Sequence, residues 1–370
     1  MPIGVIKEVK KDEHRVAMNT GAVREAAHRG HTVNIQQGAG LGAAITDADF
    51  IAAGGTILLS AEAVLRESNL IVHVKEPQAA EIEMLGPEHT LFTYLHLAAY
   101  PAVATGLMES GCTAIAYETV ETADGHLPLL APMSTIAGRM AVQEGAHHLE
   151  KAQGGRGVLM AGYPGVPGAL IVVVGAGSVG TAAAEVAHGM GARVVVLDIN
   201  PNRLGDLERR LPGLVTVHSN REAIETWVHQ ADLVIGAVLV AGDKAPTIIT
   251  EDDIRAMRPG SVVADVAIDQ GGCIETAHET THSDPTYLVH DVVHYAVGNI
   301  PGAVPATSTH ALSNATSRYV NELAGGIGTA VNRMPELVGG IEIVNGKLTS
   351  SVVGDALGIQ SHDPLAALAL

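Results

Sequence analysis

The stretch that decides the fold reads A-L-I-V-V-V-G-A-G-S-V-G-T-A-A-A-E-V-A-H-G-M-G-A-R-V-V-V-L-D and runs from Ala169 to Asp198. Its opening run, Ile171 to Val174, is apolar and β-branched, which predicts a buried parallel strand. Gly175, Gly177 and Gly180 follow in G-x-G-x-x-G spacing, ahead of a helix of small residues and a second buried strand. This order is typical of a site that binds the pyrophosphate of a dinucleotide at a helix N-terminus.

Each glycine has a separate role in this prediction. Gly175 allows a tight turn, Gly177 lets the backbone approach the pyrophosphate, and Gly180 allows the helix to pack closely on the sheet. Asp198 ends the second strand, where its carboxylate can accept hydrogen bonds from the adenosine ribose. Because a 2′-phosphate would meet like charge there, the sequence predicts NAD rather than NADP as the cofactor.

Length and charge exclude several classes of protein. The 370 residues are enough for two domains, each with its own core. No apolar run has the length of a membrane span, and the N-terminus enters a strand pattern without a signal peptide, so we expect a cytoplasmic protein with no membrane association. A net charge of −18 repels nucleic acid, and it means that an anionic substrate needs a locally positive pocket.

The spacing of the cysteine and histidine residues does not predict a metal site. Cys112 and Cys273 are too few for a disulfide framework or a zinc centre, so we expect free thiols. His290 and His294 have i, i+4 spacing, but they lie in a segment that reads as strand and loop rather than helix.

Strand-like and helix-like segments alternate along most of the chain, which predicts an α/β fold with mostly parallel sheets. The expected strands are 3–9, 31–36, 56–59, 69–74, 90–95 and 113–116, then 171–174, 193–197, 214–217, 233–238 and 261–266. Helices are expected at 21–29, 47–53, 61–67, 81–85, 103–110, 181–190, 203–210, 222–230, 251–257 and 307–323. These segments predict two doubly wound Rossmann-like domains.

The domain boundaries follow from loops and breakers. Two prolines and a turn dipeptide at 123–132 mark the first boundary, and Ser134 is expected to be the N-cap of a long helix that reaches about residue 151. A dense loop at 269–305 precedes the last long helix, a strand pair flanks the Asn345-Gly346 turn, and no regular element is expected after Ser361. We therefore expect an NAD-binding domain of residues 131–305, inserted in a substrate domain of residues 1–130 and 306–370.

Polar residues of the first domain lie at or just past predicted strand ends: Arg15, Lys75, Tyr94 and His96. Ligands of open α/β sheets bind at that edge, and two cations there could neutralise a carboxylate and polarise a neighbouring carbonyl. Each residue also has an ordinary interpretation: a solvated loop arginine, a surface ion pair of Lys75 with Glu76, a core tyrosine, a structural histidine. Their common placement favours a substrate site.

Two segments of the second domain are expected to lie near the nicotinamide of the cofactor. D-V-A-I-D-Q-G-G at 265–272 follows a strand on the edge where a nicotinamide is expected, although an aspartate there could also serve only a turn. G-N-I-P-G-A-V-P at 298–305 could cover the nicotinamide pocket or act as a hinge.

Several of these segments closely resemble the alanine dehydrogenase family, which includes the NAD-binding subunit of proton-pumping transhydrogenase. The resemblance rests on K-E-V-K-K-D-E-H-R-V-A from Lys7, V-K-E-P from Val74, F-T-Y-L-H-L-A-A from Phe92, A-Y-E-T-V from Ala116, L-L-A-P-M-S from Leu129, A-D-L-V-I-G-A-V-L-V from Ala231, D-V-A-I-D-Q-G-G-C from Asp265 and N-I-P-G-A-V-P-A-T-S-T from Asn299. It covers nearly the whole chain, to about Leu357. It implies an NAD-linked enzyme that reversibly deaminates L-alanine to pyruvate and ammonia, usually as a homohexamer.

The resemblance also implies roles for individual residues. His96 and Asp269 match the catalytic pair, and the matches to the substrate pocket are Arg15, Lys75, Tyr94 and Met133. The matches to cofactor contacts are Ser134, Gly175, Gly177, Ser178, Val179, Gly180, Asp198, Arg203, Val238, Leu239, Ile268, Asp269, Asn299 and Ile300. Two positions depart from some members of the family, since Ile300 stands where these carry methionine and Arg203 where others carry lysine.

Three alternative functions remain open at this point. The transhydrogenase subunit shares the architecture but not the alanine pocket, and a saccharopine or lysine dehydrogenase is a second relative. The third is a non-catalytic NAD sensor, which the loss of a catalytic position would have supported, and none is lost.

Overall fold

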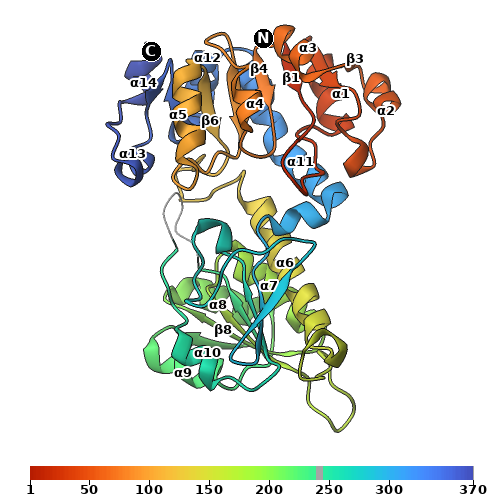
Figure 1. Cartoon of the computed structure of the whole chain (residues 1–370), viewed down its shortest axis with the longest axis vertical. Helices are drawn as coiled ribbons and strands as arrows, with labels where there is room; N and C mark the ends of the chain where they lie inside the picture. Colours follow the sequence, from red (N-terminus) through yellow and green to blue (C-terminus); the bar gives the residue numbers. More distant parts are fainter. Residues whose placement is uncertain (239–244, 370) are drawn as a thin grey trace. The chain divides into compact units, whose positions relative to one another are not determined.

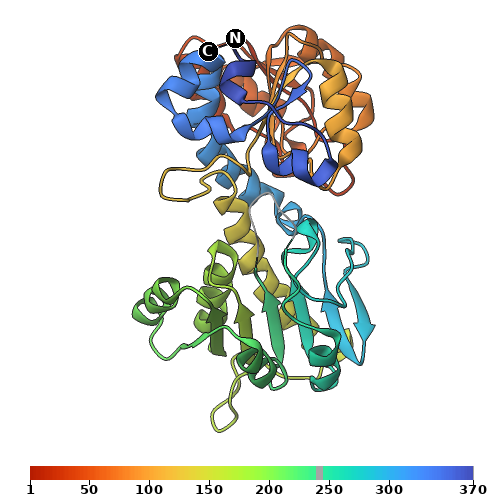
Figure 2. The same cartoon turned by 90° about the vertical axis from the view of Figure 1, so that its left-hand side faces the viewer.

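The computed structural model describes residues 1–238 and 245–369, which form two compact units (Figure 1). The first unit combines residues 1–133 with the chain from Val304 onward, and the second is Ser134–Ala303. Both chain ends therefore belong to the first unit (Figure 2), and the second unit is an insertion in it. The predicted α/β class, with two mostly parallel sheets, is confirmed.

The sheet of the first unit has the order β15-β14-β6-β5-β4-β1-β2-β3, parallel except at β14 and β15. Its strands are β1 (Ile3–Val5), β2 (Val33–Gln36), β3 (Thr56–Leu58), β4 (Leu70–Val72), β5 (Thr90–Thr93), β6 (Thr113–Ala116), β14 (Ile341–Val344) and β15 (Lys347–Leu348). Its helices are α1 (Thr20–His28), α2 (Asp47–Ala52), α3 (Ala61–Arg66), α4 (Ala79–Ile82), α5 (Pro101–Ser110), α11 (Pro305–Ala324), α12 (Ile327–Arg333), α13 (Ser351–Leu357) and α14 (Pro364–Ala367). The strand order reverses between β1 and β4, and a doubly wound sheet binds its ligand at such a point.

The sheet of the second unit has the order β12-β13-β11-β10-β7-β8-β9 and repeats the same winding (Figure 2). Its strands are β7 (Leu170–Val174), β8 (Arg193–Asp198), β9 (Val215–His218), β10 (Leu233–Gly236), β11 (Val262–Asp265), β12 (Thr286–Val289) and β13 (Val292–Tyr295). Its helices are α7 (Ser178–Gly189), α8 (Pro201–Arg210), α9 (Arg221–Val228) and α10 (Glu251–Ala256); α6 (Ala131–His148) crosses the unit boundary. The strand order of this sheet reverses between β7 and β10.

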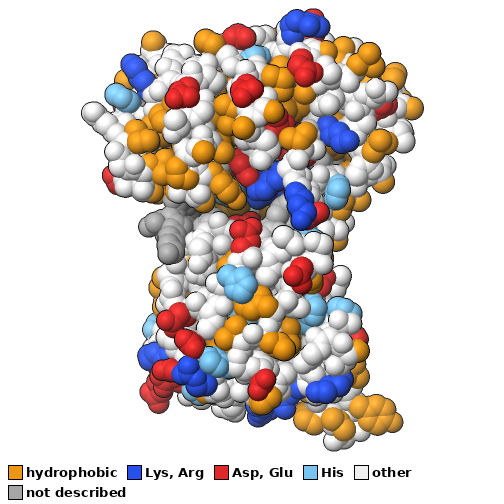
Figure 3. Space-filling model, viewed as in Figure 1, with side chains coloured by type: hydrophobic (Ala, Val, Ile, Leu, Met, Phe, Trp, Pro, Cys, Tyr) orange, Lys and Arg blue, Asp and Glu red, His pale blue; other side chains and the backbone are white. Residues whose placement is uncertain are grey.

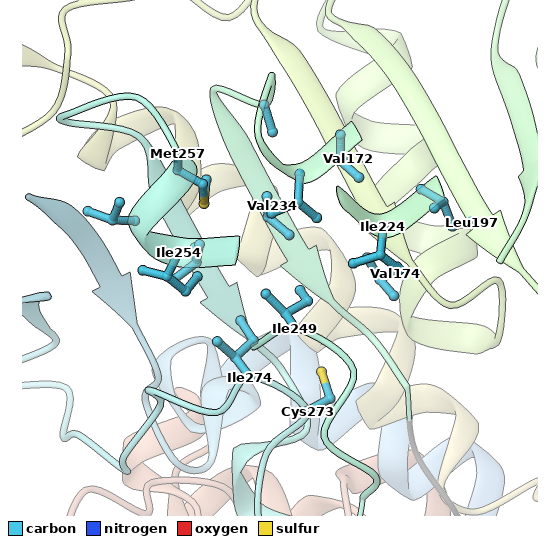
Figure 4. Close-up of a cluster of buried hydrophobic side chains, with 14 of the residues drawn as sticks. Val172, Val174, Leu197, Ile224, Val234, Ile249, Ile254, Met257, Cys273 and Ile274 are labelled. Atoms are coloured by element: carbon cyan, nitrogen blue, oxygen red, sulfur yellow. The ribbon is translucent and has the colours of Figure 1, made fainter. Parts of the chain in front are cut away.

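The core of the second unit explains the uninterrupted apolar strands. Val172 and Val234 are fully buried and pack with Ile224 of α9 and Ile254 of α10 (Figure 4). Because helices cover the faces of a parallel sheet, its strands carry apolar residues at consecutive positions rather than in alternation.

Helix boundaries follow local hydrogen bonding. Asn19 caps α1 by accepting the N–H of Ala22, and Thr46 and Asp49 form a capping box at α2. No side chain caps α7, whose N-cap is Gly177, so the N–H groups of its first turn remain available for an anion.

Three expectations from the sequence are wrong in detail. Ser134 is not an N-cap, because α6 begins at Ala131 and Pro132 is tolerated in its first turn. The tail after Ser361 is not irregular, since Asp363 caps α14 by accepting the N–H of Ala366. The dense loop at 269–305 contains the antiparallel pair β12–β13, which places His290 in its turn and His294 in a strand.

Candidate functional site

The carboxyl ends of three neighbouring strands carry the predicted substrate residues. Strand β4 pairs in parallel with β1 on one side and with β5 on the other. Arg15 lies in the segment between β1 and α1, Lys75 lies just past β4, and Tyr94 and His96 follow β5. The topology therefore brings all four residues to one edge of the first sheet.

Arg15 is a buried and fixed cation. Its side chain is 2% exposed, and its Nε donates to Oε1 of Glu13 at 2.7 Å while Nη2 pairs with Oε2 of the same carboxylate. Nη1 lies 3.0 Å from the sulfur of Met133, a residue also predicted for the pocket. Burial disfavours the charged guanidinium, but the Glu13 carboxylate outweighs it and raises the pKa of Arg15. The guanidinium is thus held permanently charged in a single orientation.

Lys75 is also buried, and its backbone is held from several directions. Its N–H donates to Oε2 of Glu8 at 3.3 Å, and its carbonyl accepts the hydroxyl of Thr93 at 2.8 Å. The residue therefore has a defined place between β4 and β5.

His96 adopts a backbone conformation that is uncommon for a residue with a side chain. Its φ is +48°, in the left-handed region, where strain tends to mark functional positions. The carboxylate of Glu118 maintains this turn by accepting the N–H of His96 at 2.6 Å and that of Leu95 at 3.0 Å. The imidazole Nδ1 lies 3.6 Å from the same carboxylate, and the ring is 13% exposed.

Tyr94 supports the histidine ring. The two rings are parallel, with centroids 6.0 Å apart, and the Tyr94 hydroxyl donates to the carbonyl of Leu129 at 2.6 Å. Burial raises the pKa of the Tyr94 phenol far above its usual value. Tyr94 is therefore a neutral wall of the site rather than an acid or a base.

The three glycines of the G-x-G-x-x-G segment lie in the tight turn between β7 and α7 and in the first turn of α7. Gly175 has a φ of +105°, and a Cβ at Gly180 would lie 1.7 Å from the carbonyl oxygen of Gly175, so only glycine permits this packing. A Cβ at Gly177 would meet nothing within 4 Å. Gly177 therefore serves no packing need of the chain itself, which fits a place where a ligand approaches the backbone. Ser178 and Val179 open helix α7 beside it.

Asp198 lies at the carboxyl end of β8, next to β7. Its Oδ2 accepts the N–H of Ala176 at 2.6 Å and its Oδ1 accepts that of Asn200 at 2.7 Å. Arg203 lies 4.0 Å from Oδ2 and is more than half exposed. The carboxylate is thus fixed beside the glycine turn by two backbone N–H groups.

A buried aspartate organises the loop after β11. Oδ2 of Asp265 accepts the N–H groups of Cys273 and Ile274 at 2.9 Å, and Oδ1 accepts that of Ala267 at 3.0 Å. Burial raises the pKa of Asp265 despite these donors. Asp265 is therefore structural, and it shapes the short helical turn Ile268–Gln270 that contains Asp269.

Asp269 is hydrogen-bonded to the segment 298–305, which the sequence predicts as a cover of the nicotinamide pocket or a hinge. The N–H of Asn299 lies 3.1 Å from Oδ1 and 3.3 Å from Oδ2 of Asp269, and Asn299 has a φ of +61°. Ile268 and Ile300 are buried beside these two residues in the sequence.

The remaining predicted positions divide between the two units. Met133 belongs to the first unit; Ser134, inside α6, and Val238, just past β10, belong to the second. Leu239 lies outside the described residues.

Sequence reasoning missed the carboxylates that hold the site together. Glu13 pairs with Arg15, and Glu118 fixes the turn at His96. Glu118 could have been found, because it lies just past β6, which pairs with β5. Glu13 gives no such signal, since it lies in an irregular charged segment.

The described residues form neither a metal-binding cluster nor a membrane-spanning helix. Across residues 1–238 and 245–369, no group of three or more His, Cys, Asp and Glu side chains is arranged to hold a metal ion. None of the helices in those ranges has the length and apolar character that crossing a bilayer requires.

Comparison with known proteins gives consistent results for both units. Residues 4–137 match the model of the alanine dehydrogenase/PNT N-terminal domain, and residues 141–351 match that of the C-terminal domain. The alanine dehydrogenase of Mycobacterium tuberculosis is 50% identical over the full length of both chains. That of Halomonas elongata is 51% identical, covering 97% of this chain and 98% of the relative.

Solved structures agree with the sequence matches. An L-alanine dehydrogenase superimposes with a TM-score of 0.92 at 47% identity, covering 97% of this chain and 99% of the other. A transhydrogenase from Sinorhizobium meliloti, 24% identical over 95% of this chain and 99% of its own, superimposes with a TM-score of 0.80 and shows the shared fold. The resemblance found in the sequence is confirmed: this chain belongs to the alanine dehydrogenase/PNT family.

Proposed function

We propose that this chain is an NAD-dependent L-alanine dehydrogenase that reversibly converts L-alanine to pyruvate and ammonia. The observation that carries the proposal is the edge of the first sheet, where Arg15, Lys75 and His96 follow three neighbouring parallel strands. Two buried cations beside an imidazole suit a small anionic substrate, in a chain whose net charge is −18. Named alanine dehydrogenases that are about half identical over the full chain support it.

The first unit binds and orients the amino acid in this proposal. Arg15 pairs with the substrate carboxylate, and its contact with Glu13 keeps the guanidinium charged and oriented. Lys75 stabilises negative charge as it develops on the substrate oxygen. Tyr94 and Met133 provide the apolar walls that suit a methyl side chain.

We assign proton transfer to the side chains of His96 and Asp269. The His96 imidazole can donate and accept a proton at the oxygen that becomes the pyruvate carbonyl. Asp269 takes a proton from the substrate ammonium or orients the water that replaces ammonia. Glu118 maintains the strained turn at His96 and so directs the ring.

We assign the nicotinamide cofactor to the second unit, and within that class we propose NAD. The open space at Gly177 and the uncapped start of α7 fit a pyrophosphate, and Asp198 fits a free 2′-hydroxyl. The other predicted contacts, Ser134, Ser178, Val179, Arg203, Val238, Leu239, Ile268, Asn299 and Ile300, belong to this part of the proposal. The bound cofactor supplies the hydride chemistry, and the protein positions the substrate and moves the protons.

We also propose that the chain works as a cytoplasmic homohexamer. The apolar side chains Leu159, Tyr163 and Val166 are each more than 60% exposed on one loop, which is drawn in yellow-green in Figure 1. Figure 3 shows hydrophobic side chains gathered at the end of that loop. A self-association surface would bury them. Light scattering of the purified chain tests the mass, with the variant Tyr163→Ser as the comparison.

The function is tested by NADH formation at 340 nm with purified protein, L-alanine and NAD. NADP replaces NAD in one control, and L-serine, glycine and L-lysine replace L-alanine in others. Turnover with L-alanine and NAD above all the controls supports the proposal. Absence of turnover with L-alanine, in a protein that still binds NADH, refutes it and favours a transhydrogenase-like or sensor role.

A further inference from the structure

A buried histidine, His73, immediately follows strand β4 and lies two residues before Lys75. His73 is 1% exposed, and its Nδ1 lies 2.6 Å from the carbonyl oxygen of Lys75. A carbonyl can only accept, so Nδ1 carries a proton and donates it. The same carbonyl accepts the hydroxyl of Thr93 at 2.8 Å, so two side chains fix its direction.

The other ring nitrogen of His73 faces two carboxylates. Nε2 lies 3.4 Å from Oε1 of Glu8 and 3.3 Å from Oε1 of Glu81, and all three side chains are buried. These are ion-pair distances rather than well-formed hydrogen bonds. A ring with an unprotonated Nε2 would turn a lone pair toward two carboxylates, so the surroundings favour the doubly protonated imidazolium.

Both carboxylates in turn hold the backbone around Lys75. Oε1 of Glu8 accepts the N–H of Val74 at 2.8 Å, and its Oε2 accepts that of Lys75 at 3.3 Å. Oε2 of Glu81 accepts the N–H of Gln78 at 2.7 Å, at the start of α4. His73 therefore connects the carbonyl of Lys75 with the groups that hold the N–H of Lys75 and the helix that follows.

We propose that His73 is a positioning residue for the substrate-binding lysine, acting as a buried imidazolium that fixes the Lys75 backbone through its carbonyl, Glu8 and Glu81. This rests on the substrate role proposed for Lys75 above. His73 does not touch the substrate. It acts by setting the direction in which the Lys75 side chain leaves the end of β4.

The pKa shifts of Glu8 and His73 agree with a charged His73 ring. Burial raises the pKa of Glu8 to about 7, with the neighbouring Glu13 adding to it and His73 opposing it. Burial opposes a charge on His73, but Glu8 and then Glu81 outweigh it and raise the pKa of His73 to about 9. Near neutral pH both ring nitrogens of His73 are therefore donors.

Three substitutions separate the two contacts of the ring. His73→Phe removes both donors at similar size. His73→Asn keeps an amide donor near the position of Nδ1, and His73→Gln keeps one near the position of Nε2. His89→Phe is the matched control, because His89 is buried in the same unit and its ring hydrogen-bonds to backbone, with the Leu65 carbonyl at 3.1 Å and the Gly86 N–H at 2.9 Å. The Glu88 carboxylate, 3.7 Å from Nδ1, is mostly exposed. It precedes β5, whereas Lys75 follows β4, so it lies at the opposite edge of the sheet.

The test combines steady-state kinetics with hydrogen exchange of the peptide that spans residues 70–78. For His73→Phe we expect kcat/KM for L-alanine and pyruvate to fall at least tenfold, mainly through KM, with the Kd for NADH unchanged. His73→Asn should recover most of the loss, His73→Gln less, and His89→Phe should remain within twofold of wild type in KM. Exchange at Val74 and Lys75 should accelerate in His73→Phe and not in His89→Phe.

Two results would overturn the inference. One is an unchanged KM and unchanged exchange in His73→Phe, and the other is an equal loss in His73→Phe and His89→Phe. If the wild-type chain does not oxidise L-alanine, the proposed function fails, and the exchange rates alone still decide whether His73 fixes the Lys75 backbone.

Discussion

Replacing Gly177 by alanine separates cofactor binding from folding more cleanly than any other change in the glycine turn. Gly177 has φ −74° and ψ −165°, which any residue can adopt, and a Cβ there meets nothing within 4 Å. Alanine is a poorer N-cap than glycine by up to about 1 kcal/mol, while its smaller unfolded-state entropy offsets roughly 0.4–1 kcal/mol. The free protein should therefore change by less than about 1 kcal/mol in stability.

Binding should respond very differently. A methyl group at Gly177 occupies the space where the pyrophosphate approaches the start of α7, so the phosphate must move away from the N–H groups there. Each hydrogen bond to a charged group contributes about 1.5–3 kcal/mol, and losing one or two of them amounts to roughly 3 kcal/mol. That corresponds to about a hundredfold rise in the Kd for NADH.

The assay is fluorescence titration with NADH, alongside thermal unfolding of the unliganded protein. Gly189→Ala is the control, because Gly189 ends the same helix and a Cβ there also meets nothing within 4 Å. It should bind NADH normally and gain up to about 1 kcal/mol from the better helix former. Wild-type affinity in Gly177→Ala would refute the assignment of this turn to the pyrophosphate.

Further predictions concern packing, the His96 turn and pH. Gly180→Ala places a Cβ 1.7 Å from the Gly175 oxygen, so thermal unfolding should show a disrupted second unit, and a wild-type Tm would contradict the packing argument. Glu118→Ala leaves the buried N–H of Leu95 and the partly buried N–H of His96 without their acceptor, so the free energy of unfolding in urea should fall by about 2–5 kcal/mol, with a lower kcat as His96 relaxes. Glu118→Gln keeps an acceptor oxygen and should lose less than half of that. His73 has a pKa of about 9 in the folded protein, so its stabilisation is complete below pH 6.5 and is lost as the pH rises through 9. The free energy of unfolding in urea should fall by up to about 3 kcal/mol across this window through His73 in wild type. His73→Gln should lose that part and keep only the smaller fall from Glu8, whose pKa is raised to about 7, so an equal fall in both proteins would contradict the role of His73.

Much of the fold could be predicted because its strongest signals are local. The run before Gly175 and the spacing of the glycines identify a strand, a turn and a helix without any long-range information. The same holds for Lys75 and His96, since a position just past a strand is visible in the sequence and β4 and β5 are parallel neighbours. Arg15 lies farther from its strand than expected, because β1 ends at Val5.

What could not be predicted depends on contacts between distant segments. Glu118 acts on a turn 22 residues away, and the contact of Glu8 with Val74 spans 66 residues, so no local pattern reports either. The prediction that Ser134 is an N-cap is wrong because a serine before an apolar run resembles a cap, whereas the helix begins at Ala131. Short helices such as α14 depend on a single cap and give little periodicity.

The most direct test of the central claim compares wild type with His96→Ala in NADH formation from L-alanine at 340 nm, with NADH affinity and Tm measured on both proteins. Proton transfer by a positioned side chain contributes about 10²–10⁴-fold to a rate, so we expect kcat to fall by at least a hundredfold while NADH affinity and Tm remain close to wild type. A His96→Ala variant that oxidises L-alanine at the wild-type rate would contradict the account, because the edge of the first sheet would then not be where the reaction takes place.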